Sequence, residues 1–139
     1  MRNKLTLLIP LLLAGCIQQS ASYYISDARD HAITVRAEQE YFWEDTVSLS
    51  LVAARFPDCQ RAIVLDKVPK GQVAVELFSN AENVFTVRAG KRVVQVDMQS
   101  CTQLPDPAQN ALGEAVGVFR LGDAKMGFEP AAKAAAPAS

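Results

Sequence analysis

The feature that most constrains this chain is an alternation of apolar and polar residues with a period of two. It is clearest in TVSLSL, residues 46–51, where the apolar side chains Val47, Leu49 and Leu51 alternate with hydroxyl side chains. Successive side chains of a strand point to opposite faces, so this pattern predicts a strand with one buried face. The alternation recurs in segments 73–77, 85–87 and 94–98. Together these segments predict a mostly antiparallel sheet with one face against a core.

The turn RAGKR gives a test of strand register. A two-residue loop that begins at Gly90 sets Val87 opposite Val94. The same register sets Phe85 opposite Val96, so the apolar faces of the two strands match. Glycine at the first loop position suits a type II′ turn, which favours a tight hairpin here.

Further elements are expected around these strands. The motif VPKG places proline and glycine where a reverse turn needs them, so we expect the strand at 62–66 to turn there. It would then pair, as a meander, with the strand that starts near Gln72. Asp106 is expected to cap a short helix. Other strands are expected at 33–41 and 115–121.

These patterns predict an all-β domain over residues 32–122. Its six or seven strands fit a small, mostly antiparallel β-sandwich or a partly closed barrel, and the sequence favours neither of these two. Nothing repeats at a fixed period, which argues against a solenoid or a propeller.

The N-terminus resembles a secretory signal. Arg2 and Lys4 precede an apolar stretch from Leu5 to Leu13. As a helix this stretch would be about 14 Å long, too short to span a hydrocarbon core of about 30 Å. A positive region followed by a short apolar region predicts a signal peptide over residues 1–15.

The signal ends in Leu13-Ala14-Gly15-Cys16, which resembles the lipobox of bacterial lipoproteins at every position. The resemblance implies a diacylglycerol thioether on Cys16 and cleavage just before it. This covalent lipid is the only cofactor-like group expected, and two or three acyl chains anchor a protein stably to a membrane. Ile17 stands where an aspartate would imply retention in the inner membrane. The resemblance therefore implies the periplasmic face of the outer membrane, with the inner membrane less favoured.

The segments that flank the domain are poor in packing residues. Residues 16–31 are mostly small and polar and are expected to form a disordered tether, and 123–139 a disordered low-complexity tail. Without residues 1–15 the chain has 124 residues, 12 basic and 15 acidic side chains and a formal charge of −3. No basic run remains to follow a phosphate backbone, so nucleic acid is not an expected partner.

Of the three cysteines, Cys16 lies in the lipobox, and Cys59 and Cys101 lie in the expected domain. If Cys16 carries lipid, Cys59 and Cys101 remain as an even pair in an oxidising compartment. We expect them to form a disulfide. The alternative is two free thiols or a pair of metal ligands.

The sequence offers few catalytic groups. His31 is the only histidine, so a Ser-His-Asp triad or a zinc site would depend on it alone. A loose metal site formed by Asp27, Asp30 and His31 is less favoured than a solvated linker, so no metal is expected.

Four carboxylates come in pairs, Glu38 with Glu40 and Glu44 with Asp45. Charges on an exposed strand face or in a turn explain them better than a glycosidase pair, which needs a cleft. The chain is therefore not expected to be an enzyme.

Two stretches are candidate binding elements. In YFWED, alternation puts Tyr41 and Trp43 on one face, so at least one side of this stretch is expected to be buried. Core packing is favoured over a binding surface. In FPDCQR a proline and a half-cystine fix a segment that displays Asp58, Gln60 and Arg61. This segment is a recognition loop or, more simply, a structural corner.

These observations favour a non-catalytic binding or scaffolding module of the cell envelope. Its expected partners are the membrane, through the lipid anchor, and an envelope protein or peptidoglycan. Periplasmic inhibitors of lysozyme are similar in size, anchor and β-rich architecture and provide the alternative function. An envelope enzyme that acts on peptidoglycan through the four carboxylates is less favoured.

The lipobox makes a direct prediction. Growth with an inhibitor of the lipoprotein signal peptidase should cause the uncleaved precursor to accumulate, because that peptidase cuts only before a lipidated cysteine. Immunoblotting measures the mass of the chain. Unchanged processing would show that Cys16 is not a lipobox cysteine.

Overall fold

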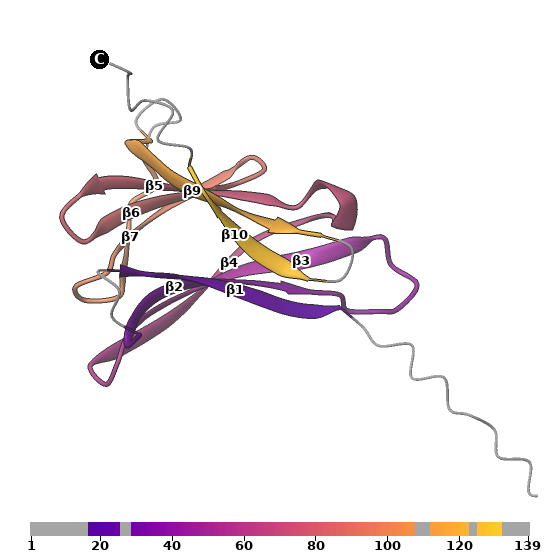
Figure 1. The fold of residues 1–139 in the computed structure, drawn as a ribbon, viewed down its shortest axis with the longest axis horizontal. Helices are drawn as coiled ribbons and strands as arrows, with labels where there is room; N and C mark the ends of the chain where they lie inside the picture. The colour runs from indigo at the N-terminus through magenta and orange to yellow at the C-terminus, as the bar shows by residue number, and fades with distance from the viewer. Residues whose placement is uncertain (1–16, 26–28, 108–111, 123–124, 132–139) are drawn as a thin grey trace, which may run out of the picture.

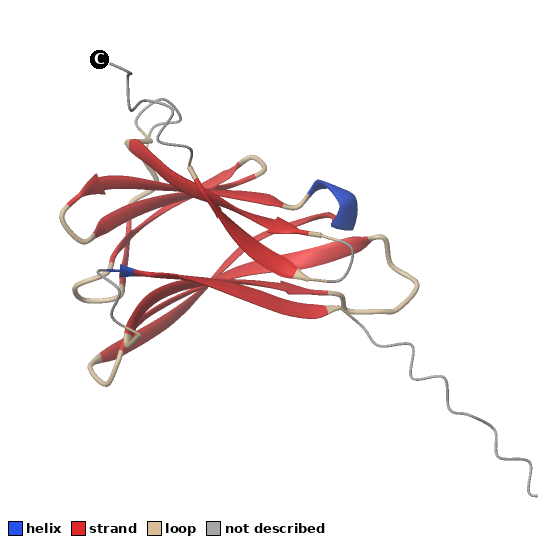
Figure 2. Ribbon diagram, viewed as in Figure 1, coloured by secondary structure: helices blue, strands red, loops and turns tan. Residues whose placement is uncertain are grey.

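The computed structural model describes residues 17–25, 29–107, 112–122 and 125–131, which form two antiparallel sheets packed face to face (Figure 1). The first sheet has the order β1-β2-β3-β4, with β1 (Gln18–Tyr24), β2 (His31–Glu38), β3 (Thr46–Arg55) and β4 (Cys59–Pro69). The second sheet has the order β10-β9-β5-β6-β7-β8. Its strands are β5 (Ala74–Ala81), β6 (Val84–Ala89), β7 (Arg92–Asp97), β8 (Thr102–Leu104), β9 (Glu114–Leu121) and β10 (Met126–Pro130). Strands are the dominant secondary structure of the described residues (Figure 2), so the predicted all-β class is confirmed, and the two-layer form is a sandwich.

The core lies between the sheets and follows the predicted alternation. Val47, Leu49 and Leu51 are at most 1% exposed. From the second sheet, Leu77 and Phe119 are fully buried in the same cluster. Each strand thus gives one face to a shared apolar layer, and burial of that layer drives folding.

The predicted hairpin is confirmed in register. β6 and β7 pair Val87 with Val94 and Phe85 with Val96. Gly90 has a φ of +61°, a conformation that favours glycine and that a type II′ turn requires at its first position. Local turn chemistry and the apolar pattern therefore specify the same pairing.

The predicted meander through VPKG is wrong. β4 continues to Pro69, which lies opposite Thr46 of β3. The chain then crosses to the second sheet through a 3₁₀ turn, η2 (Lys70–Gln72). Proline is tolerated there because β4 is an edge strand, where a missing backbone N–H costs no ladder hydrogen bond.

Both predicted flexible flanks contain strands, so these two boundaries are wrong. Within the expected tether, β1 pairs with β2 along its whole length. Within the expected tail, β10 pairs with β9. The rings of Tyr23 and Phe128 lie 5.3 Å apart, so the edge strands of the two sheets pack against each other and close one side of the core. The folded domain therefore extends from 17 to 131 rather than from 32 to 122.

Several expectations lie outside the described residues. These are the signal peptide and Cys16, the helix expected after Asp106, which would need residues 108–111, and the last part of the tail, 132–139. In the part of the chain that the structure does describe, no helix has the length and apolar character needed to cross a membrane.

The predicted disulfide is present and joins the two sheets. Cys59 begins β4, and Cys101 lies in the turn before β8, with a Cα–Cα distance of 5.9 Å. Two further contacts tie the same turn to the first sheet. His31 Nε2 lies 3.1 Å from the carbonyl oxygen of Met98, and Arg55 Nε donates to that of Gln99 at 2.8 Å.

Removal of the disulfide is predicted to destabilise the domain. For cysteines 42 residues apart in sequence, the chain-entropy model gives a loss of about 4 kcal/mol in the free energy of unfolding for Cys59→Ala/Cys101→Ala. Urea denaturation measures this loss. The exposed neighbour Gln99→Ala serves as the control and should change stability by less than about 0.5 kcal/mol. A double variant as stable as the wild type would contradict this role.

Candidate binding surfaces

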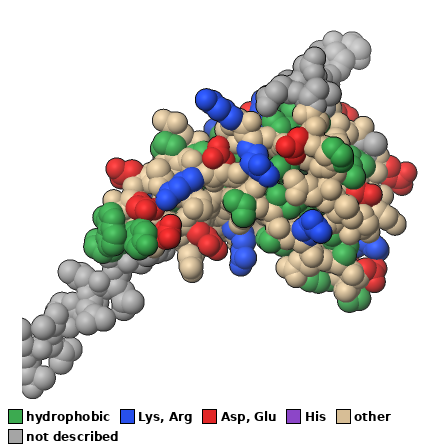
Figure 3. Space-filling view, turned by 180° about the vertical axis from the view of Figure 1, so that it is seen from behind, with side chains coloured by type: hydrophobic (Ala, Val, Ile, Leu, Met, Phe, Trp, Pro, Cys, Tyr) green, Lys and Arg blue, Asp and Glu red, His purple; other side chains and the backbone are tan. Residues whose placement is uncertain are grey.

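The aromatic residues of YFWED lie in the loop between β2 and β3, and all of them are exposed. Tyr41 is 45% exposed, Phe42 61% and Trp43 65%. The expected core packing is therefore wrong, because β2 ends at Glu38 and the strand alternation does not extend into the loop. The rings contact one another instead: Trp43 stacks on Tyr41 at 4.8 Å and meets Phe42 edge-on at 4.9 Å. Figure 3 shows hydrophobic side chains gathered at this end of the molecule, with acidic side chains beside them.

Gln39 holds this loop in place. Its side chain is buried, and its Nε2 donates to the carbonyl oxygens of Phe42, at 3.4 Å, and of Glu44. Its backbone N–H donates to the carbonyl oxygen of Ile17 at 2.8 Å. One buried amide thus connects the aromatic loop to the start of β1.

The second surface is the outer face of the first sheet. Since Ile33, Val35 and Ala37 of β2 point into the core, the intervening side chains point outward. Strand pairing aligns the outward residues in rows. One row is Ser22, Thr34, Val52 and Ala62, and the next is Tyr24, Ala32, Ala54 and Gln60. Most side chains in the middle of this face are therefore small, namely those of Ser22, Ala32, Thr34, Val52 and Ala54.

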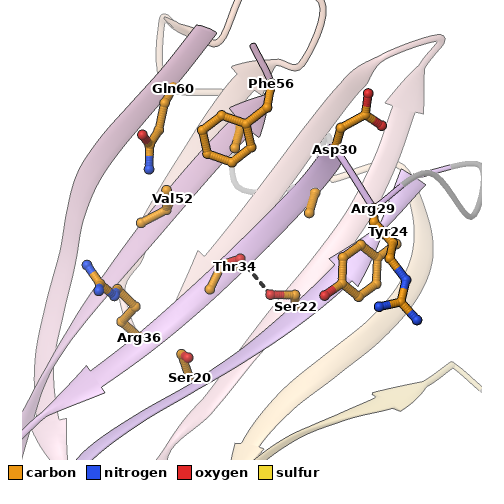
Figure 4. Close-up of a pocket in the computed structure, with 12 residues that line it drawn as sticks. Ser20, Ser22, Tyr24, Arg29, Asp30, Thr34, Arg36, Val52, Phe56 and Gln60 are labelled. Carbon is orange, nitrogen blue, oxygen red and sulfur yellow. Dashed lines mark hydrogen bonds between the residues drawn. The ribbon is translucent and has the colours of Figure 1, made fainter.

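Larger side chains border these small ones and create an open hollow of about 320 Å³ (Figure 4). The rings of Tyr24 and Phe56 stand at one end, and Arg36 stands at the other. The Ser22 and Thr34 hydroxyls lie 2.6 Å apart between them. The complete lining consists of Ser20, Ser22, Tyr24, Arg29, Asp30, Ala32, Thr34, Arg36, Val52, Ala54, Phe56 and Gln60.

Two guanidinium groups border the hollow without a carboxylate partner. Among the described residues, neither Arg29 nor Arg36 has an ion pair or a side-chain hydrogen bond. Arg36 and Ser20 also line an adjoining hollow of about 250 Å³, next to Gln18 and Glu38. The two hollows together follow β1 and β2 along the sheet.

The predicted binding residues fall on different parts of the molecule. Gln60 lines the main hollow, whereas Arg61 is exposed outside it. Asp58 lies in the turn before β4 and accepts a hydrogen bond from Arg55 at 2.9 Å. By strand rise, Gln60 and Trp43 are roughly 25 Å apart along the sheet, so they belong to separate surfaces.

The remaining polar residues have structural contacts. Besides its contact with Met98, His31 belongs to no group of metal-binding side chains among the described residues, and Asp27 lies outside them. Lys67 lies 3.4 Å from a carboxylate oxygen of Glu44 and 3.9 Å from one of Glu40. The expected strand-face pair of Glu38 and Glu40 is wrong, because Glu40 lies in the loop.

Comparison of this chain with protein-family models, with curated proteins and with solved structures found no match.

Sequence reasoning missed most of the main hollow. Tyr24 and Arg29 belong to the segment that the sequence predicts to be a tether. Arg36 is a single charge on a predicted strand, which does not by itself indicate a binding site. The hollow depends on which residues face each other across four strands, and only the observed register reveals that. A usable signal was the alternation of Ala21, Tyr23 and Ile25, which points to a strand in which Tyr24 faces outward.

Exposure of the aromatic loop predicts that Trp43→Ala is nearly neutral for folding. The free energy of unfolding should fall by less than about 1 kcal/mol, because little apolar surface leaves the core. Leu49→Ala, at a fully buried site, should cost about 2–5 kcal/mol in the same urea titration. Equal losses for the two variants would contradict the exposed position of Trp43.

Proposed function

We propose that this protein is a lipid-anchored, non-catalytic binding module at the periplasmic face of the outer membrane. The outer face of the β1–β4 sheet is its binding surface, and its ligand is a carboxylate-bearing polymer of the envelope. Peptidoglycan is the favoured ligand, because its strands carry both sugar rings and peptide carboxylates. The observation that carries this proposal is Arg36, an unpaired guanidinium in a hollow that two exposed rings border.

The lining supports a polar ligand with flat apolar faces. A guanidinium binds a carboxylate with two parallel hydrogen bonds, and both Arg29 and Arg36 have this capacity available. Tyr24 and Phe56 present apolar ring faces at the surface. Hydroxyl and amide groups between them supply further hydrogen bonds, as is typical of ligand sites with a few placed polar groups.

Exposed apolar residues concentrate on the same half of the sandwich. The large exposed hydrophobic residues among those described are Tyr24, Tyr41, Phe42, Trp43, Phe56 and Val64. All of them belong to the β1–β4 sheet, to its β2–β3 loop or to the turn before β4. The outer face of the second sheet instead carries paired charges, such as Arg88 with Glu76. An interaction surface is more apolar at its centre than the rest of a protein surface, so Tyr24, Phe56 and Val64 on the outer face of the first sheet favour that face.

Different residues support the proposed lipid anchor and the proposed non-catalytic role. The anchor rests on the lipobox at Cys16, which directly precedes Ile17, the first described residue. The non-catalytic role is supported by the contacts of the acids and the histidine, because Glu40 and Glu44 flank Lys67 and His31 contacts a backbone carbonyl.

The proposal predicts loss of binding when the hollow changes. Arg36→Ala should weaken co-sedimentation of the purified protein with isolated peptidoglycan sacculi at least about tenfold, because a hydrogen bond to a charged group contributes about 1.5–3 kcal/mol. Thr34→Trp should abolish binding, because an indole would fill the space between the bordering side chains. The dissociation constants from sedimentation measure both effects.

The matched control is Arg120→Ala, which removes an exposed arginine from β9 in the other sheet. It should bind like the wild type. No sedimentation of the wild type, or equal sedimentation of Thr34→Trp, would contradict the proposal. Stoichiometric inhibition of lysozyme by the wild type and not by Thr34→Trp would instead identify the same face as an inhibitor surface.

A further inference from the structure

We infer that the β2–β3 loop is a second membrane contact, and that its aromatic side chains enter the interfacial region of the bilayer that holds the lipid of Cys16. This inference rests on the proposed lipidation. The inference also gives the domain a fixed orientation, because the domain would dock on the bilayer through Tyr41, Phe42 and Trp43 and would not rotate freely about its lipid anchor.

The aromatic loop lies close to the start of β1, and therefore close to the position of the proposed lipid. Gln39, at the start of the loop, hydrogen-bonds to Ile17 through its backbone N–H, at 2.8 Å, and lies 3.4 Å from the Ile17 nitrogen through its side-chain oxygen. Ile17 directly follows Cys16 in sequence. Figure 1 shows that the start of β1 and the β2–β3 loop lie at the same end of the sandwich. An acyl chain on Cys16 would therefore bring the bilayer next to the aromatic rings.

The chemistry of the rings supports the same contact. Tryptophan and tyrosine are enriched at membrane–water interfaces, because each has an apolar body and a polar group. Here the three rings contact one another and stand clear of the core, so they present a preformed apolar patch. An exposed patch of this kind marks a contact with a membrane or a partner.

Part of the backbone of the loop is already paired within the domain. Gln39 donates to the carbonyl oxygens of Phe42 and Glu44, and the Glu44 N–H donates to that of Tyr41 at 3.0 Å. Unpaired backbone groups are costly in a region poor in water. The buried Gln39 amide removes part of that cost.

Charge defines the kind of lipid surface. Glu40, Glu44 and Asp45 flank the rings. Lys67 lies beside Glu40 and Glu44, and the backbone N–H of Lys70 donates to the carbonyl oxygen of Asp45 at 2.8 Å. The acids outnumber the lysines, which favours a zwitterionic surface over an anionic one. A bilayer is favoured over a protein as the occupant, because the anchor would hold the loop at a high effective concentration next to lipid.

Trp43 is the only tryptophan, so intrinsic fluorescence reports on this loop alone. The lipidated protein, reconstituted in phosphatidylcholine–phosphatidylethanolamine vesicles, should show blue-shifted emission relative to the unlipidated Cys16→Ser protein in buffer. Vesicles with brominated acyl chains should quench most of this emission. Increasing amounts of phosphatidylglycerol should weaken both effects.

The control moves the reporter to the other end of the first sheet. In Trp43→Phe/Phe56→Trp, the tryptophan lies in the turn after β3, beside the end of β1 that is distant from Ile17. Its emission should not be quenched by brominated lipid. Phe42→Ser should reduce quenching of Trp43 while the protein still floats with the vesicles through its lipid.

Flotation and mass spectrometry test whether the protein is lipidated, whereas quenching tests whether the loop docks. A failure of lipidation can therefore be distinguished from a failure of docking. Protein that floats with vesicles but shows unshifted, unquenched Trp43 emission would overturn the docking inference. If the native protein carries no lipid, the mature chain can be coupled through Cys16, its one cysteine outside the disulfide, to a maleimide phospholipid. Quenching of Trp43 in that form supports docking, and its absence overturns it.

Discussion

The structure depends on burial of one face of every long strand in a single apolar layer. A slip of one residue would expose that face, so the buried residues fix the register of each strand. Register in turn determines what the opposite face displays. The small residues around Thr34, the unpaired Arg36 and the two bordering rings share one surface because Ile33 and Val35 are held in the core.

The two ends of the first sheet differ in the way they are stabilised. At one end, the sheet is joined to the β7–β8 turn by contacts of Cys59, His31 and Arg55. These contacts fix the chain segments beside the hollow to the second sheet. At the other end, Gln39 bridges the aromatic loop and the start of β1. In the docked orientation that we infer, the second end faces the bilayer and the hollow runs away from it along β1 and β2.

Sequence patterns predicted the strands that carry regular aliphatic alternation, the 90–91 hairpin and the disulfide. They missed β1 and β10, because neither edge strand carries a run of aliphatic residues at a period of two. β1 instead packs Ala21 and Tyr23 against the core, and β10 packs Met126 and Phe128. They also assigned Trp43 to the core, since alternation was extended past Glu38, where the chain leaves the sheet. The hollow could not be predicted, because Arg36 and Phe56 line the same hollow only through the pairing of β2 with β3.

The most direct test of this account is site-specific photo-crosslinking of the lipidated protein in living cells, with the photoreactive residue at Gln60 or at Arg120. Gln60 borders the hollow, whereas Arg120 lies in the other sheet. If the outer face of the first sheet binds peptidoglycan, Gln60 should become attached to it and Arg120 should not. Attachment from both positions alike, or attachment from Arg120 alone, would contradict the assignment of the first sheet as the binding surface.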